Sequence, residues 1–351
     1  MAKSPTIYDV AERAGVSKSL VSLVLRGSPR VSEEKREAVL AAAAELDYTP
    51  SRLAAGLAGS RTRGVGVVID EFENLWFAPV LEGLRAALGD GGYSLSVTDT
   101  SLNAHLGQGP LEVFRSLRVD GVVIAGEVPA ETVARLTVPA VVLGTRALRA
   151  PKVPVVASDE VLGGRLAAAH LADLGHRDIV CLSAPGASAA AREAGYLAEM
   201  RERGLAPRVV RAERTSEAAA RTAAEREIFA GAGAGGGARI GDSASSVGVS
   251  EPVRDLPTAV FAVNDPMAVG VIGAARERGL AVPHDVSVVG YDDSPLAAYE
   301  LVSLTSVSGD PRELGEAAGR ALVAMIEGIA DPEPALFAPR LVERASTSAP
   351  R

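Results

Sequence analysis

The sequence predicts an N-terminal all-α headpiece containing a helix-turn-helix, followed by an α/β core of two doubly wound parallel-sheet lobes. Up to residue 63 the apolar residues recur at helical spacing, whereas beyond it short β-rich runs alternate with helical stretches. The charge changes at the same place. Residues 1–63 hold ten lysines and arginines against seven acids, although the whole chain has a net charge of −8. A basic head on an acidic body indicates that the head meets a polyanion.

Composition narrows the class of protein further. With 351 residues, 47% of them hydrophobic and 23% charged, the chain is long enough for two or three globular domains. The single cysteine excludes an internal disulfide and a multi-cysteine metal site. No secretory segment or membrane-length apolar run is visible, so we expect a cytoplasmic protein that does not contact a membrane. Dispersed histidines and the lack of a nucleophile–base set predict no metal, no cofactor and no catalytic residue.

Three helices are expected in the headpiece. The first begins at a capping box formed by Thr6 and Asp9 and ends at Gly15. The second runs from Ser17 to about Leu25, and the third from Glu33 to about Leu46. The short glycine-containing turn between the first two helices is typical of a helix-turn-helix, whose second helix enters the major groove. The alternative is a small three-helix domain with a solvated polar face.

The core alternates predicted strands with predicted helices. The first set of strands is 65–69, 93–98, 121–125, 140–143 and 153–157, and the second set is 178–182, 258–263 and 286–290. The helices between and after them are 77–88, 111–117, 130–136, 161–174, 190–203, 218–229, 266–278 and 312–326. Continuous apolar strands separated by helices predict parallel sheets covered on both faces. Ligands of such folds bind at the carboxyl ends of the strands, here in the cleft between the lobes.

Several motifs resemble one known family. In the headpiece these are Ile7 to Ser17, Val21-Ser22, Val31-Ser32 and Leu46 to Pro50, and in the core Gly175-His-Arg177, Pro257 to Gly270 and Asp285 to Asp293. Together they resemble the lactose-repressor (LacI/GalR) family of bacterial transcription factors. The resemblance extends over nearly the whole chain. It implies a core similar to periplasmic sugar-binding proteins, and a hinge helix at residues 51–59.

The resemblance implies specific DNA contacts. Bases would be contacted by Lys18, Ser19, Leu23, Arg26, Ala54 and Leu57, and phosphates by Thr6, Ser17, Ser22 and Arg30. Many members carry a base-reading arginine where this chain has Leu23, so its half-site is expected to differ there. Arg26 lies where asparagine is common and reaches either a phosphate or a base.

The hinge segment has a physical argument of its own. Residues 51–59 are too short to form a stable isolated helix, and Gly56 weakens that helix further. We therefore expect it to fold only when paired with its twin on DNA. Leu57 would then wedge into the central base step and kink the duplex, while Ala54 lies in the minor groove. The alternative is that Leu57 packs on the core.

Effector contacts are implied in the same way. The positions expected to line the cleft are Trp76, Phe77, Arg146, Arg192, Asn264 and Asp292. Asn264 and Asp265 match a strand-end pair near the ligand. Asp265 is expected to cap the following helix, and a ligand contact is the alternative. Sugar-binding members often carry an aspartate where this chain has Gly144, so the ligand is either smaller, differently oriented, or anionic and met by Arg146. We expect a carbohydrate effector, with a purine or another metabolite as the alternative.

These inferences define a domain plan and a function. The headpiece is residues 1–50, the hinge and linker 51–63, and the core 64–351. The first lobe takes 64–159 and 309–338 and the second 160–292 and 339–351, with crossings near 158–160, 292–308 and 338. Residues 230–250, rich in Gly, Ala and Ser, are expected to form a surface loop.

The predicted function is a ligand-controlled repressor that binds a pseudo-palindromic, double-stranded operator as a homodimer. No tetramer-forming coiled coil is expected, because no leucine heptads follow residue 328. The rival classes are a solute-binding protein and an enzyme.

Overall fold

The computed structural model describes residues 5–25, 28–49, 61–89, 91–100, 102, 105, 107–126, 128, 130–146, 153–230 and 256–351. The chain divides into two compact units, Met1–Arg63 and Gly64–Arg351. Arg26, the predicted hinge contacts Ala54 and Leu57, and most of the Gly/Ala/Ser-rich stretch lie outside the described residues.

The first unit is a three-helix domain. Its helices are α1 (Ile7–Arg13), α2 (Lys18–Leu25) and α3 (Glu33–Glu45), as the sequence predicts. The capping box is present, because the backbone N–H and the hydroxyl of Thr6 both donate to Asp9 Oδ2, at 2.6 and 2.7 Å. Gly15, with φ +65°, takes the left-handed conformation that the turn requires. Val10, Val21, Val24 and Val39 form the buried centre.

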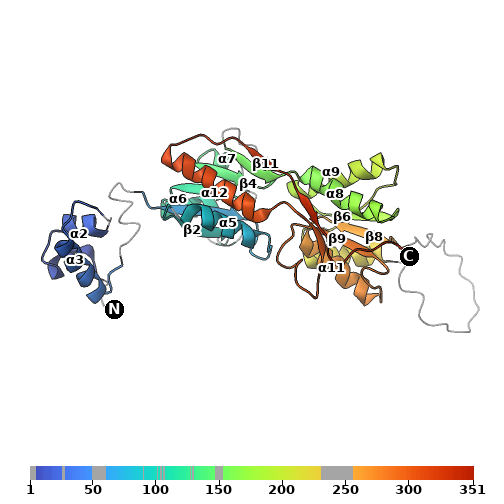
Figure 1. Ribbon diagram of the computed structural model, residues 1–351, viewed down its shortest axis with the longest axis horizontal. Helices are drawn as coiled ribbons and strands as arrows, with labels where there is room; N and C mark the ends of the chain where they lie inside the picture. The colour runs from blue at the N-terminus through green and yellow to red at the C-terminus, as the bar shows by residue number, and fades with distance from the viewer. Residues whose placement is uncertain are drawn as a thin grey trace, which may run out of the picture. The chain divides into compact units, whose positions relative to one another are not determined.

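The first lobe of the second unit is a doubly wound sheet (Figure 1). Its strands are β1 (Gly64–Ile69), β2 (Ser94–Asp99), β3 (Gly121–Ile124), β4 (Ala140–Leu143), β5 (Val155–Ser158) and β11 (Ala335–Phe337). They are all parallel, in the order β11-β5-β4-β3-β1-β2. One apolar cluster joins the sheet to α5 (Phe77–Gly89) and α12 (Pro311–Glu327). A second cluster joins it to α6 (Pro110–Leu117) and α7 (Ala130–Val133), so helices cover both faces.

The second lobe repeats this plan. Its strands are β6 (Ile179–Ser183), β7 (Arg208–Arg211), β8 (Ala259–Ala262), β9 (Ser287–Tyr291), β10 (Thr305–Ser308) and β12 (Arg340–Val342). They lie in the order β12-β10-β9-β8-β6-β7, with β12 antiparallel to β10. The helices are α8 (Glu160–Asp173), α9 (Ala187–Glu202), α10 (Glu217–Ala223), its π-helical continuation Ala224–Ile228, and α11 (Asp265–Glu277).

Glycines allow the main helix pair of each lobe to pack closely. In the first lobe, a Cβ added to Gly83 of α5 or to Gly315 of α12 would run into a backbone carbonyl of the other helix. In the second lobe the same holds for Gly164 of α8 and Gly195 of α9. Both lobes therefore use reciprocal small residues to bring two helix backbones together.

The predicted fold class is confirmed, but the structure adds four strands that the sequence analysis did not identify. These are β7, β10, β11 and β12, which have three or four residues each. β7 carries arginine at both ends, and β10 reads Thr-Ser-Val-Ser although it is entirely buried. Neither has the apolar run that predicts a buried strand.

The position of β10 also decides where the chain passes between lobes. β10 pairs with β9, so residues 305–308 lie in the second sheet, and the next helix, α12, packs on the first. The remaining passages fall between β5 and α8 and between β11 and β12.

The predicted helix 130–136 is shorter in the structure, where α7 ends at Val133.

Candidate functional site: the interlobe cleft and the exposed face of the headpiece

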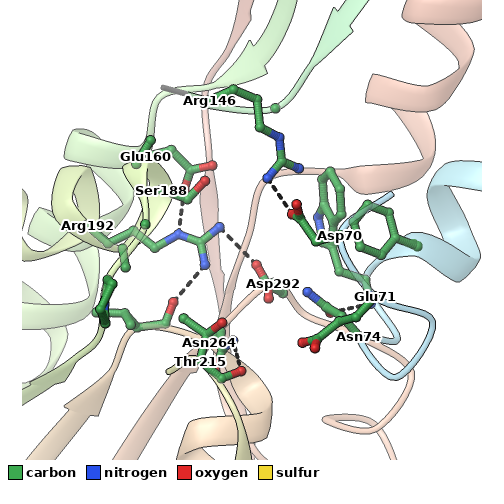
Figure 2. Close-up of a pocket in the computed structure, with 18 residues that line it drawn as sticks. Asp70, Glu71, Asn74, Arg146, Glu160, Ser188, Arg192, Thr215, Asn264 and Asp292 are labelled. Atoms are coloured by element: carbon green, nitrogen blue, oxygen red, sulfur yellow. Dashed lines mark hydrogen bonds and ion pairs between the residues drawn. The ribbon is translucent and has the colours of Figure 1, made fainter. Parts of the chain in front are cut away.

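A cavity of about 260 Å³ lies between the two sheets of the second unit. Its lining comes from loops that follow β1 and β4 of the first lobe and from α8, α9 and the ends of β8 and β9 of the second. Figure 2 shows the side chains of both walls directed into it. All six residues predicted for the effector line this cavity, namely Trp76, Phe77, Arg146, Arg192, Asn264 and Asp292.

Arg192 organises the second-lobe wall. Its Nε donates to Glu160 Oε2 at 2.6 Å, its Nη1 to the Val263 carbonyl at 2.7 Å, and its Nη2 lies 3.0 Å from Asp292 Oδ1. The guanidinium also stacks on Tyr291, 3.7 Å from the ring centroid. The three charged side chains are at most 9% exposed. Arg192 is therefore fixed from three directions, and the cluster carries one net negative charge when both carboxylates are ionised.

Asp292 is held in a strained conformation at the end of β9. Its φ of +106° lies in the region that favours glycine, and its N–H donates to the Val307 carbonyl of β10 at 2.8 Å. Burial raises the pKa of Asp292 to about 7, although Arg192 opposes the shift and the nearby Asp265 and Glu160 add to it. The effect of burial on this carboxylate outweighs the stabilisation by Arg192, and hydrogen-bond donors from a ligand would stabilise its ionised form.

Arg146 organises the first-lobe wall. It forms an ion pair with Asp70 at 2.8 Å and donates from Nε to the Leu143 carbonyl at 3.3 Å. Gly144 has φ +80°, so an aspartate at this position would be strained. The backbone conformation therefore gives a physical reason why this chain lacks the aspartate that sugar-binding members often carry here. Asp70, which the sequence analysis did not identify, provides a carboxylate on the same wall.

The aromatic pair differs from its prediction in one respect. Trp76 and Phe77 are in edge-to-face contact, with ring centroids 5.1 Å apart. Phe77 is buried in the first-lobe core, whereas Trp76 is only partly covered. Only Trp76 therefore offers a substantial ring face to a ligand.

Asn264, and not the expected Asp265, caps the helix that follows β8. Asn264 caps α11, because its Oδ1 accepts the Met267 N–H at 2.9 Å. Asp265 does not cap the helix. Its carboxylate accepts from the Ser294 N–H and hydroxyl, at 2.7 and 2.8 Å, and from the Ser306 hydroxyl at 2.6 Å. The prediction of capping by Asp265 is wrong, because this side chain ties α11 to β10, a strand that the sequence did not reveal.

One further hydrogen bond joins the walls. The Ser188 hydroxyl, in the first turn of α9, donates to the Thr145 carbonyl of the first lobe at 3.0 Å. Glu71, Asn74, Glu160, Ser188 and Thr215 also line the cavity, and the sequence analysis identified none of them. Glu71 and Glu160 each lie two positions after the end of a strand, β1 and β5 respectively, and this position was the available signal.

The headpiece presents the predicted DNA-contacting residues of α2 and its flanks. Ser17, Lys18, Ser19, Leu23 and Arg30 are exposed, and Thr6 and Ser22 are half-buried. Lys18 Nζ lies 3.1 Å from the Tyr8 hydroxyl and 4.8 Å from the centre of its ring, which orients the lysine across α1. The Ser17 hydroxyl accepts the Leu20 N–H at 3.2 Å and so caps α2.

Comparison with known proteins agrees with this two-part organisation. Residues 6–51 match the model described as bacterial regulatory proteins, lacI family. Residues 62–228 match the periplasmic binding proteins and sugar binding domain of that family, and residues 168–347 match a periplasmic binding protein-like domain. The HTH-type transcriptional repressor PurR of Erwinia tasmaniensis is 33% identical over 98% of this chain and 97% of its own. The chain belongs to the LacI family.

Other LacI-family proteins show the same architecture. PurR of Escherichia coli O139:H28 is 32% identical over 98% of this chain and 97% of its own. The crystal structure of the Lac repressor dimer bound to operator and the anti-inducer ONPF superposes with a TM-score of 0.79, at 28% identity over 99% of this chain and 100% of that one. A LacI-family regulator from Corynebacterium glutamicum gives a TM-score of 0.69 at 32% identity, over 83% of this chain and 100% of that one.

Membership of the LacI family establishes the class of function. The protein is a DNA-binding transcriptional repressor and not an enzyme. No helix within the described ranges is long and apolar enough to cross a membrane.

Proposed function

We propose that this LacI-family repressor binds a pseudo-palindromic operator as a homodimer and that a small molecule in the interlobe cleft controls its affinity for DNA. The observation that carries this proposal is the cavity itself, which two lobes share and which opens where the strands of both sheets end. Such a cavity couples ligand binding to the angle between the lobes. An effector that favours one angle by a few kcal/mol is sufficient to change operator occupancy several hundredfold. We expect this action in the cytoplasm, where the chromosome lies.

The DNA contacts are assigned to α2 and to the hinge. In this proposal Lys18 and Ser19 read base edges, Leu23 packs against a base, and Arg26 reaches a base or a phosphate. Thr6, Ser17, Ser22 and Arg30 contact phosphates and set the register. Ala54 and Leu57 lie outside the described residues, and their role in the minor groove rests on the resemblance of the hinge sequence.

The dimer is assigned to the core. Leu301 is 96% exposed and Tyr299 is 58% exposed, in the segment between β9 and β10. Two such apolar side chains together favour contact with a second copy, and the Lac repressor was solved as a dimer. Sedimentation of Leu301→Glu tests this assignment. We expect a shift toward monomer and weaker operator binding, and an unchanged dimer would contradict it.

The effector is assigned to the class of small hydroxylated metabolites, with carbohydrate as the proposal. The partly covered ring of Trp76 suits the apolar face of a sugar, and the carboxylates of both walls suit its hydroxyl groups. A purine is the second candidate, because the PurR relatives named above are 32–33% identical to this chain. At about 260 Å³ the cavity suits a monosaccharide or a nucleobase better than an oligosaccharide.

Selection of binding sites from randomised duplex DNA tests the proposal as a whole. The full chain is expected to enrich a pseudo-palindrome, and residues 64–351 alone, one of the two compact units, to enrich nothing. Lys18→Ala should change the preferred half-site, whereas Lys35→Ala, exposed on α3, should leave it unchanged. Enrichment by residues 64–351 alone, or of one asymmetric site by the full chain, would refute the proposal.

A further inference from the structure

The charge of the cavity restricts the chemistry of its ligand. Four carboxylates line it, those of Asp70, Glu71, Glu160 and Asp292, against the two guanidinium groups of Arg146 and Arg192. No lysine or histidine belongs to the lining. With every group in its ordinary charge state, the lining carries two net negative charges, and such a cleft concentrates cations and disfavours anions.

Both guanidinium groups are already engaged by the protein. Every nitrogen of Arg192 has an internal partner within 3.0 Å, namely Glu160, the Val263 carbonyl and Asp292. Arg146 is bound to Asp70 and to the Leu143 carbonyl. At Arg192, a ligand phosphate or carboxylate would therefore have to displace a buried internal carboxylate, which would remain in the cleft without a partner. At Arg146, the excess of carboxylates in the lining opposes an anionic effector.

Acceptors, in contrast, are available on both walls. Glu71 forms neither a hydrogen bond nor an ion pair with any of the described residues. Partial burial and the neighbouring Glu73 and Asp70 raise its pKa, although Arg214 opposes the shift. Across the cleft, burial and the neighbouring Asp265 and Glu160 raise the pKa of Asp292. In the view of Figure 2, Asp292 lies between Arg192 and Glu71.

Resting on the proposed function, we propose that the effector is a monosaccharide-sized polyol that carries a protonated amino group, an aminosugar in its simplest form. The ammonium group is held by the carboxylates of Glu71 and Asp292, and the ring packs on Trp76. The ligand thereby supplies a positive charge and hydrogen-bond donors to a cleft that has an excess of acceptors. Because one carboxylate belongs to each lobe, the amino group also links the two lobes.

Calorimetric titration of the full chain with matched sugars tests this proposal. The sets are built on glucose, galactose and mannose, and each contains the hexose, its 2-amino form, the N-acetylated amine and the 6-phosphate. In one set we expect the amino sugar to bind at least about tenfold more tightly than the hexose or the N-acetyl form, with no binding of the phosphate. The proposal is overturned if the phosphate or the hexose binds as tightly as the amine, or if no compound binds.

Two matched variants test whether the preference for the amino sugar depends on the carboxylate of Glu71. Glu71→Gln should remove the preference for the amine, roughly tenfold, with a smaller loss of affinity for the hexose. Glu73→Gln changes an exposed acid of the same loop that does not line the cavity, and it should keep the preference within about twofold. Equal losses for amine and hexose in Glu71→Gln would overturn the role of this residue.

Operator binding, measured on the same preparations, separates this proposal from the proposed function. Wild type that binds its selected operator but shows no amine preference refutes the aminosugar alone. Wild type that selects no operator refutes the proposed function, whatever it does with sugars.

Discussion

The two walls of the cleft each contain an arginine paired with carboxylates, but the two ion clusters differ in burial. Arg192, Glu160 and Asp292 of the second lobe are at most 9% exposed and are joined to the backbone at Val263. On the first-lobe wall, Arg146 is 11% exposed and its partner Asp70 is 36% exposed. Figure 2 shows the two clusters facing each other across the cavity.

This difference indicates that the two lobes contribute to ligand binding in different ways. A buried, fully bonded cluster is costly to disturb, because removal of one partner leaves charges without solvent or counter-ion. An ion pair whose carboxylate is partly exposed is screened by water and rearranges at little cost. The second-lobe wall is therefore the preorganised part of the site, and the first-lobe wall is the part that adapts when a ligand enters.

The largest expected effect tests the rigid wall. Arg192→Ala leaves Glu160 and Asp292 buried without their shared cation, and should reduce the free energy of unfolding by about 3–5 kcal/mol. Urea denaturation followed by circular dichroism measures the loss. A loss below about 1 kcal/mol would show that the cluster contributes no more to stability than a surface ion pair.

The second expected effect tests the packing beneath that wall. Gly164→Ala places a methyl group against the backbone carbonyl of Arg192 and should destabilise the protein by about 1–3 kcal/mol. The control is Gly89→Ala at the end of α5, where an added Cβ meets nothing within 4 Å. The control should be neutral or slightly stabilising, and equal losses in both variants would contradict the close-packing argument.

The third expected effect is a dependence on pH. Burial raises the pKa of Asp265 to about 6, above its ordinary value of 3.8, despite the three bonds it accepts from Ser294 and Ser306. The folded protein therefore holds a proton that unfolding releases, and this contribution to stability is lost as the pH rises. Between pH 5 and 7 the free energy of unfolding should fall by roughly 1–2 kcal/mol from this residue.

Asp265→Asn is the comparison for that measurement, because it removes the titrating group and keeps an acceptor. Its unfolding free energy, measured over the same pH range, should decline less steeply than that of wild type. Parallel curves would show that Asp265 is ionised in the folded protein throughout this range.

The smallest expected effect tests the adaptable wall. Arg146→Ala removes a partly exposed ion pair and should change the free energy of unfolding by less than about 1 kcal/mol. The same urea titration applies as for Arg192→Ala, which makes the two variants directly comparable. If Arg146→Ala and Arg192→Ala reduce the free energy of unfolding by the same amount, the contrast between the walls is wrong.

The sequence by itself determined the elements whose signals are local. The three headpiece helices follow from caps, Gly15 and helical spacing, and the apolar strands of both sheets follow from short β-rich runs. The resemblance to the LacI/GalR family also placed six residues that do line one cavity, although Trp76 and Arg192 are 116 positions apart in the chain.

Only the tertiary structure decided the roles that depend on distant neighbours. β10 is a polar strand that is buried because β9 and β12 flank it, and no local pattern indicates that environment. For the same reason Asn264 and not Asp265 caps α11. The Asp265 carboxylate instead accepts hydrogen bonds from Ser306 of β10, a strand that the sequence did not reveal, and from Ser294 in the loop after β9. The charge of the cleft likewise depends on which carboxylates the arginines engage, and that pairing arises only when separate segments of the chain meet.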